Sequence, residues 1–341
     1  MWKAMDEILG RLEKLKKNGS KMKYDEMLLD LIPYLKYFQY VQGGEGKAYF
    51  IGKDYVVKEY SKSFDMDLFD KYFETYCREI QGFSKKELVV PKIYSWNSIP
   101  QVVVKRSTPR IQYNYYIMEE RIKGRPIFSG LMEDVFHLCA DICQEKQFNN
   151  VVFNPYMDGK LYNEIVKRYI DDYILMNRSI ESLSESDIEK FVMSVYQMFE
   201  EGENSSPDMY PSNVILSPNS GLFMIDNHLI SKKDDVYYNS TTPEEFTLTG
   251  LLFLFLYNEQ VADIKHHPYF ITEGANFDLE ERVARNGKAC ESAIKKIMKV
   301  TKKCISSPVV FKKNILLRLH AMLKNILGKD KANEIVDIMQ K

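Results

Sequence analysis

The sequence predicts an α+β fold of two lobes, a small β-rich lobe followed by a larger α-helical lobe. The first 120 residues contain several short strand-like segments, whereas the chain from Gly130 onward shows mostly helical spacing of apolar residues. A length of 341 residues with 45% apolar and 13% aromatic residues supplies enough side chains for both cores. These proportions also exclude a chain that is disordered or fibrous throughout.

Residues 1–36 are expected to form an N-terminal helical extension. Two apolar stripes at helical spacing lie on either side of Asn18-Gly19-Ser20, which breaks the pattern. The stripes consist of Ile8, Leu9, Leu12 and Leu15, and of Met27, Leu28, Leu31, Ile32 and Leu35. Periodicity leaves two roles open for these helices, namely packing on the small lobe or recruiting a partner.

Residues 37–120 are expected to form the small lobe, a sheet with one inserted helix. The expected strands cover residues 38–42, 47–51, 55–60, 102–105 and 113–119, and the expected helix covers 65–82. Glycines separate the first two strands, and Gly52-Lys53-Asp54 forms a hairpin turn between the next two.

Residues 121–341 are expected to form the larger lobe. Helical patterns cover residues 131–147, 161–182, 187–201, 245–260 and 279 to the end. One β-hairpin interrupts them, because apolar segments at 214–216 and 222–225 flank a run of turn-forming residues, Ser217-Pro218-Asn219-Ser220-Gly221.

This hairpin is expected to gather oxygen-bearing side chains. Asn213 stands just before its first strand and Asp226 just after its second, so an antiparallel arrangement places both at one end. Asp208 lies five residues before Asn213, on the entering loop. Carboxylate and amide oxygens are ligands that Mg²⁺ takes readily. The sequence therefore predicts a Mg²⁺ site here, with ordinary Asp and Asn caps in a surface turn as the alternative.

A second group of candidate residues lies in the expected small lobe. Gly43, Gly44 and Gly46 let backbone N–H groups approach phosphates closely, although a plain Gly-rich turn explains them equally well. Lys58 lies among apolar residues on a later strand, and Glu79 follows 21 residues further on, in the expected helix. A Lys–Glu pair held there could aim the ammonium group at nucleotide phosphates.

The order of these features resembles the protein-kinase-like superfamily, which includes protein kinases and aminoglycoside phosphotransferases. The motifs that carry the resemblance are Gly43–Tyr49, Val56-Val57-Lys58, Arg78-Glu79-Ile80, Tyr116-Ile117-Met118-Glu119-Glu120 with Gly124, Asp208–Asn213, Asp226 and Thr242-Pro243-Glu244. They look, in that order, like the Gly-rich loop, the Lys strand, the helix with its Glu partner, the hinge, the catalytic loop D-x-x-x-x-N, the D-F-G Asp and the A-P-E region.

The resemblance implies a bilobal protein-kinase-like fold that uses ATP and Mg²⁺. It implies that Glu79 orients Lys58 toward the α- and β-phosphates, that Asn213 and Asp226 hold Mg²⁺, and that Asp208 accepts the proton of the acceptor hydroxyl. It further implies a nucleotide-binding set consisting of Gly43, Gly44, Gly46, Lys58, Met118, Glu119 and Arg121, with the last three lining the adenine pocket.

Departures from the family pattern leave three functions open. The His-Arg before the catalytic Asp is Ser206-Pro207 here, the following Lys of Ser/Thr kinases is Tyr210, and D-F-G reads Asp226-Asn227-His228. We favour an atypical Ser/Thr protein kinase. A small-molecule phosphotransferase similar to aminoglycoside kinases, and a nucleotide-binding pseudokinase scaffold, are the alternatives. The acceptor is accordingly a hydroxyl group of a protein or of a small molecule.

A net charge of −1 hides a basic C-terminal segment. Residues 282–341 hold 15 Lys and Arg against 4 Asp and Glu. Within it, residues 294–303 form a basic amphipathic pattern, either a solvated helix face or a contact for an anionic lipid, an inositol phosphate or an acidic protein. Aromatic residues are not interleaved with this run, which argues against nucleic acid as a partner.

We expect no transmembrane segment, since the longest apolar run, Leu248–Tyr257, is about half the length of a bilayer span. The N-terminus shows no secretory signal pattern. Five scattered cysteines favour a reducing compartment over a disulfide framework. These features predict a cytoplasmic location, which for a chain of bacterial or viral origin includes delivery into a host cell.

Overall fold

The computed structural model places most of the chain. It describes residues 2–18, 20–42, 46–60, 66–105, 108–126, 181–209, 213–217, 221–256 and 295–305, positions 292, 320 and 324, and residues 329–340. These residues divide into two compact units. The first unit comprises Met1–Lys123, Gln197–Pro207 and Phe223–Thr241, and the second comprises Gly124–Tyr196, Asp208–Leu222 and Thr242–Lys341. The expected domain limits at residues 36 and 120 stay predictions.

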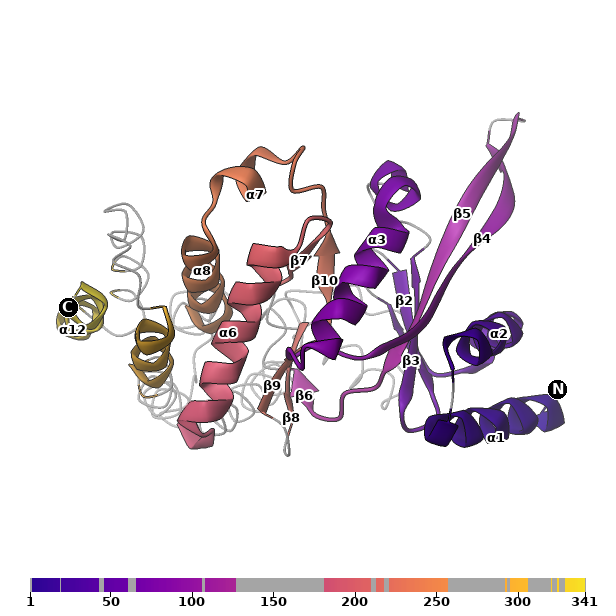
Figure 1. Ribbon diagram of the computed structural model, residues 1–341, viewed down its shortest axis with the longest axis horizontal. Helices are drawn as coiled ribbons and strands as arrows, with labels where there is room; N and C mark the ends of the chain where they lie inside the picture. Colours follow the sequence, from indigo (N-terminus) through magenta and orange to yellow (C-terminus); the bar gives the residue numbers. More distant parts are fainter. Residues whose placement is uncertain are drawn as a thin grey trace, which may run out of the picture. The chain divides into compact units, whose positions relative to one another are not determined.

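The first unit is built on a five-stranded antiparallel sheet (Figure 1). In spatial order its strands are β1 (Tyr40–Gln42), β2 (Gly46–Ile51), β3 (Tyr55–Tyr60), β5 (Thr108–Glu120) and β4 (Ile93–Lys105). Helices and strands therefore occur together, which confirms the α+β class. The bilobal arrangement stays a prediction.

The N-terminal helices α1 (Trp2–Asn18) and α2 (Lys21–Leu31), followed by the short η1 (Ile32–Tyr37), pack on one face of this sheet (Figure 1). Their buried side chains share one core with inward-facing residues of β2, β3 and β5. The members of this core are Ile8, Leu12, Tyr24, Met27, Leu28, Leu31, Leu35, Tyr49, Ile51, Tyr55, Val57, Tyr116 and Met118. Of the two roles that periodicity left open, packing on the sheet is therefore the one the structure displays.

Helix α3 (Met66–Lys85) covers the opposite face of the sheet (Figure 1). The Phe69 ring lies 5.1 Å from the Tyr60 ring and 5.5 Å from the Tyr115 ring, measured between centroids. Successive side chains of a strand point to opposite faces. Lys58 is two residues from Tyr60 on β3, and Glu119 is four residues from Tyr115 on β5. Both side chains therefore lie on the face of the sheet that α3 covers.

A short two-stranded ladder completes the first unit beside α3. Strand β7 (Ser205–Pro207) pairs antiparallel with β10 (Asn227–Leu229), and the Pro207–Asn227 pair stands at one end of the ladder. The hydroxyl of Tyr76, on α3, donates a 3.0 Å hydrogen bond to the carbonyl oxygen of Asn227. Along the chain, Asp208 follows Pro207 and Asp226 precedes Asn227. The ladder thus fixes the backbone next to both acidic residues.

A smaller sheet has the order β6 (Arg125–Pro126), β8 (Val214–Ser217) and β9 (Gly221–Met224), which confirms the predicted hairpin. Further helices among the described residues are α6 (Glu185–Glu201), α7 (Val236–Ser240), α8 (Pro243–Leu256) and α12 (Lys329–Gln340). Thr242 and Glu245 exchange backbone-to-side-chain hydrogen bonds of 3.2 and 3.4 Å at the start of α8, which is a capping box. The helix expected at 131–147 and nearly all of the one expected at 161–182 lie outside the described residues.

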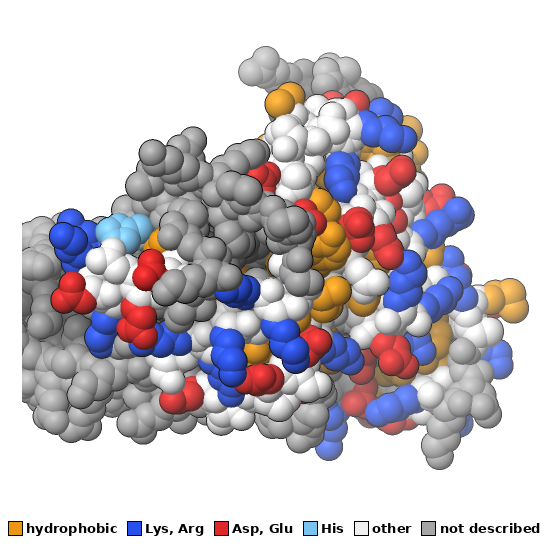
Figure 2. All heavy atoms as spheres, turned by 60° about the vertical axis from the view of Figure 1, so that its left-hand side comes forward, with side chains coloured by type: hydrophobic (Ala, Val, Ile, Leu, Met, Phe, Trp, Pro, Cys, Tyr) orange, Lys and Arg blue, Asp and Glu red, His pale blue; other side chains and the backbone are white. Residues whose placement is uncertain are grey.

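Lysines of the basic segment face acidic residues of their own unit. Lys299 Nζ lies 3.1 Å from Glu185, and Lys303 Nζ lies 3.6 Å from Glu189, both on α6. Lys295 pairs with Glu334 of α12 at 3.0 Å. Lys, Arg and acidic side chains are accordingly interspersed on the face drawn in Figure 2. These pairs lower the local positive charge, and an anionic partner for residues 282–341 stays a prediction.

Among the helices that the structure describes, none combines the length and the apolar character needed to cross a bilayer. Helix α8 carries the longest apolar run of the sequence but has only 14 residues. Its length suits a helix of the protein core rather than a membrane span.

Candidate active site

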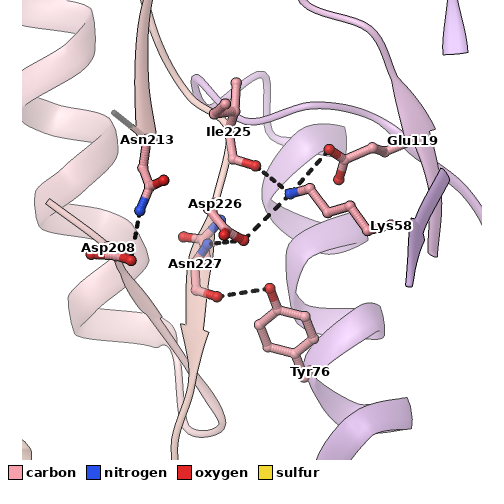
Figure 3. A network of polar contacts seen from close by, with 8 residues as sticks. All are labelled: Lys58, Tyr76, Glu119, Asp208, Asn213, Ile225, Asp226 and Asn227. Carbon is pink, nitrogen blue, oxygen red and sulfur yellow. Dashed lines mark hydrogen bonds and ion pairs between the residues drawn. The ribbon is translucent and has the colours of Figure 1, made fainter. Parts of the chain in front are cut away.

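Lys58 is the centre of a polar cluster within the first unit (Figure 3). Its ammonium nitrogen lies 3.1 Å from Glu119 Oε1 and 3.3 Å from Asp226 Oδ1, and it donates a short hydrogen bond to the carbonyl oxygen of Ile225. Only 14% of the Lys58 side chain is exposed. An ammonium group has three hydrogens to donate, and three acceptors surround this one.

Strand register explains how Glu119 reaches Lys58. In the β3–β5 ladder Lys58 stands opposite Ile117, so Glu119 is its diagonal neighbour two residues along β5. Diagonal neighbours on one face of a sheet lie within reach of long side chains. Asp226 arrives from a different element, the connection between β9 and β10, which the β7–β10 ladder holds in place.

Burial and charge act in opposite directions on this cluster. Burial would lower the pKa of Lys58, but the carboxylates of Asp226 and Glu119 raise it above its ordinary value. Burial raises the pKa of Glu119 to about 7, although the neighbouring Lys58 ammonium lowers it. Lys58 therefore stays charged over the neutral range. The Asp226 side chain is 37% exposed against 9% for Glu119, so Asp226 is the carboxylate open to a ligand.

Glu79 does not form the expected pair with Lys58, which corrects the prediction made from the resemblance. Its carboxylate accepts hydrogen bonds from the backbone N–H of Asn204, at 3.1 Å to both oxygens, and from the Asn204 side-chain amide at 3.1 Å. It also accepts one of 2.8 Å from the Ser205 hydroxyl. Tyr76 and Glu79 are three apart and share one face of α3. That face is directed at the β7–β10 ladder, which explains why Glu79 meets residues 204 and 205.

We expect Glu79→Ala to lower the free energy of unfolding by about 1–3 kcal/mol, because it leaves the buried donors of Asn204 and Ser205 without their acceptor. Urea unfolding of the variant measures the loss. Glu74→Ala is the matched control, since Glu74 lies on the same helix, is 67% exposed and pairs with exposed Arg78. Equal stabilities of the two variants would contradict the anchoring function of Glu79.

The second unit contains the Asp208–Asn213 pair that the sequence spacing predicted. The side-chain amide of Asn213 donates a 2.6 Å hydrogen bond to Asp208 Oδ2. Next to Asp208, Met209 is buried against α8, where a Cβ on Gly250 would lie 2.6 Å from Met209 Cγ. Gly250 is therefore needed for Met209 to pack here, and this packing fixes the backbone beside Asp208. Neither residue was singled out from the sequence.

Part of the expected Gly-rich loop is described. Gly46 opens β2, and a Cβ at this position would lie 1.8 Å from the carbonyl oxygen of Glu59 on β3. The close approach of the two strands is therefore a packing reason for glycine at 46. Gly43 and Gly44 lie outside the described residues, and phosphate contacts by all three glycines stay predictions.

The expected adenine-pocket residues have structural partners within the first unit. The Met118 side chain is fully buried in the core beneath α1 and α2. The Arg121 guanidinium donates a 3.1 Å hydrogen bond to the Gly52 carbonyl oxygen and lies 4.6 Å from the Phe50 ring centroid. Glu119 turns its side chain to Lys58. These contacts leave adenine recognition by the backbone of this segment as a prediction.

The chemistry of the candidate metal ligands fits Mg²⁺. Within the described part of the chain, no three His, Cys, Asp or Glu side chains are grouped as a metal site. Mg²⁺ in phosphotransferases needs no such cage, because one or two carboxylates, water and substrate phosphates complete its coordination. Asp226 and Asn213 offer a carboxylate and an amide oxygen, which are hard ligands of that kind.

Comparison with known proteins identifies no family for the chain. No protein-family model matches it, and no curated protein matches it significantly. The crystal structure of an aminoglycoside phosphotransferase from Alicyclobacillus acidocaldarius is similar over 89% of this chain and 91% of its own, with 10% sequence identity and a TM-score of 0.28.

Proposed function

We propose that the protein is an ATP-dependent phosphotransferase that moves the γ-phosphoryl group of Mg-ATP to a hydroxyl group. The observation that supports this is the ion pair between Lys58 and Asp226, two residues 168 apart in the sequence whose charged atoms lie 3.3 Å apart. A lysine for nucleotide phosphates beside a partly exposed carboxylate for their metal is an arrangement that suits phosphoryl transfer.

Each polar residue has a distinct function in the proposed reaction. Lys58 binds the nucleotide phosphates, and Asp226 with Asn213 holds Mg²⁺. When bound, Mg²⁺ neutralises charge on the phosphate oxygens. Asp208 accepts the proton of the acceptor hydroxyl while Asn213 holds its carboxylate. The hydroxyl oxygen bonds to the γ-phosphorus, the bond from that phosphorus to the β–γ bridging oxygen breaks, and ADP leaves.

We favour a protein Ser or Thr hydroxyl as the acceptor, which makes the protein an atypical protein kinase. A small-molecule acceptor is the alternative, and a pseudokinase scaffold that binds nucleotide without transfer is the third possibility. The presence of Lys58, Asp208, Asn213 and Asp226 together argues against the scaffold, because nucleotide binding alone does not need all four.

The test uses ATP labelled on its γ-phosphate with the purified full chain and Mg²⁺. Label is followed in three arms, with the protein alone, with added basic and acidic protein acceptors, and with an added aminoglycoside. Label on protein supports the kinase, and ATP consumption only with the aminoglycoside supports a small-molecule acceptor. We expect chelation of Mg²⁺ by EDTA to abolish transfer in every arm. If the protein binds nucleotide but transfers label in none of the three arms, the proposed reaction is refuted.

A further inference from the structure

We propose that Glu119 is the residue that positions Lys58, in place of Glu79. The inference rests on the proposed function, because it assigns the carboxylate that holds the phosphate-binding ammonium. Glu119 is a positioning residue in this assignment, since it acts on the nucleotide through Lys58. The sequence resemblance had placed Glu119 in the adenine pocket instead.

The geometry distinguishes the two carboxylates that contact Lys58. Glu119 lies on β5, an inner strand between β3 and β4, its side chain is 9% exposed, and its Oε1 atom is 3.1 Å from Lys58 Nζ. Asp226 lies in the connection before β10 and is 37% exposed. A metal ion bound by Asp226 would withdraw that carboxylate from Lys58. Glu119 and the Ile225 carbonyl oxygen would then keep the ammonium in place.

Glu79 has a different function because its hydrogen-bonding capacity is used elsewhere. Both of its carboxylate oxygens accept hydrogen bonds from Asn204, which precedes β7, and one also accepts from Ser205, the first residue of β7. Along the chain, β7 leads directly to Asp208. Two carboxylates thus divide two tasks, with Glu119 holding Lys58 and Glu79 holding the backbone that precedes Asp208.

Replacement of Glu119 by Gln has a specific consequence for the metal. Among the described residues, Asp226 would be the carboxylate left beside Lys58. Lys58 would then compete with Mg²⁺ for Asp226, so more Mg²⁺ would be needed to bind nucleotide. Loss of a supporting group behind a metal ligand weakens metal affinity by about 10–100-fold.

The pairing itself is tested without nucleotide by a double-mutant cycle. Urea midpoints are measured for Lys58→Met, Glu119→Gln and the double variant, and for the same cycle with Glu79→Gln. We expect the Lys58–Glu119 cycle to be non-additive, with the double variant losing less than the two single losses combined. The Lys58–Glu79 cycle should be additive. The reverse pattern, or additivity in both cycles, would overturn the assignment. Because the double variant removes both buried charges, we expect it to fold even if a single variant folds poorly, so the stabilities can still be compared.

The consequence for the metal is tested by titrating Mg²⁺ into the full chain with a non-hydrolysable ATP analogue. We expect the half-saturating Mg²⁺ concentration of Glu119→Gln to rise about tenfold over wild type. Glu74→Gln is the matched control, because Glu74 is a 67% exposed carboxylate of the same unit, and its midpoint should stay at the wild-type value. If wild type binds the analogue and Glu119→Gln is indistinguishable from it, the positioning function is wrong. If wild type binds none, the proposed phosphotransferase function fails, and the unfolding cycles still decide the pairing.

Discussion

Asp226→Asn is expected to lower Mg-ATP turnover by about a thousandfold or more, the effect of losing several kcal/mol of charge stabilisation around the transferred phosphoryl group. The variant keeps the side-chain shape but removes the charge that a hard metal ion requires. It also leaves the fold largely undisturbed, because Lys58 retains Glu119 and the Ile225 carbonyl oxygen. The measurement is the rate of labelled phosphate release or transfer at saturating Mg²⁺.

The control for this prediction is Asp67→Asn, an exposed carboxylate in the first turn of α3 within the same unit. Its turnover should equal that of wild type, and both variants should unfold in urea close to the wild-type midpoint. A folded Asp226→Asn protein with unchanged turnover would remove Asp226 from the metal site and with it the proposed reaction.

Elements fixed by local chemistry could be predicted from the sequence. Strand β3 covers Tyr55–Tyr60, the expected residues, and the turn before it contains Gly52 with a positive φ of 62°. Gly221 closes the β8–β9 hairpin with φ of 77°. Such backbone conformations suit glycine and need no distant partner. Turn residues between apolar runs therefore carry enough information to position these strands.

The long β4–β5 hairpin could not be predicted to its full length. Strand-like patterns indicated residues 102–105 and 113–119, whereas the strands cover Ile93–Lys105 and Thr108–Glu120. The part of β4 that precedes residue 102 contains polar residues and Pro100, which hide a strand in the sequence. Pairing with β5 supplies its backbone hydrogen bonds, so tertiary context overrides the weak local preference.

The candidate site shows the same division between local and distant information. The spacing of Asp208 and Asn213 predicted their contact, because the two residues stand only five positions apart in the sequence. The prediction of Glu79 as the partner of Lys58 was wrong. The identity of this partner depends on the register of β5 against β3 and on which strand the Glu79 face of α3 contacts. Sequence patterns give the face of a helix but not the neighbour that this face meets. The sequence did contain a signal for Glu119. It stands two residues after Ile117 and four after Tyr115, so all three side chains point to the same face of the sheet, the face that contains Lys58.

Asp208→Asn is expected to lower kcat by about 10²–10⁴-fold and to leave the KM for ATP close to that of wild type. The proposed function of Asp208 is to accept a proton from the acceptor hydroxyl, which an amide cannot do. Asparagine still offers an oxygen to the Asn213 side-chain amide, which donates to Asp208 Oδ2 at 2.6 Å in the structure. The contact between positions 208 and 213 should therefore be kept. Transfer of labelled phosphate at varied ATP concentrations separates kcat from KM.

The control is Asp330→Asn, an exposed carboxylate on α12 of the same unit, which should transfer phosphate at the wild-type rate. A fall in kcat for Asp208→Asn with unchanged KM supports a function in the chemical step, because nucleotide binding is then intact. A rise in KM with unchanged kcat would instead make Asp208 a binding residue. Unchanged transfer in Asp208→Asn beside lost transfer in Asp226→Asn would show that the acceptor hydroxyl loses its proton to a different group.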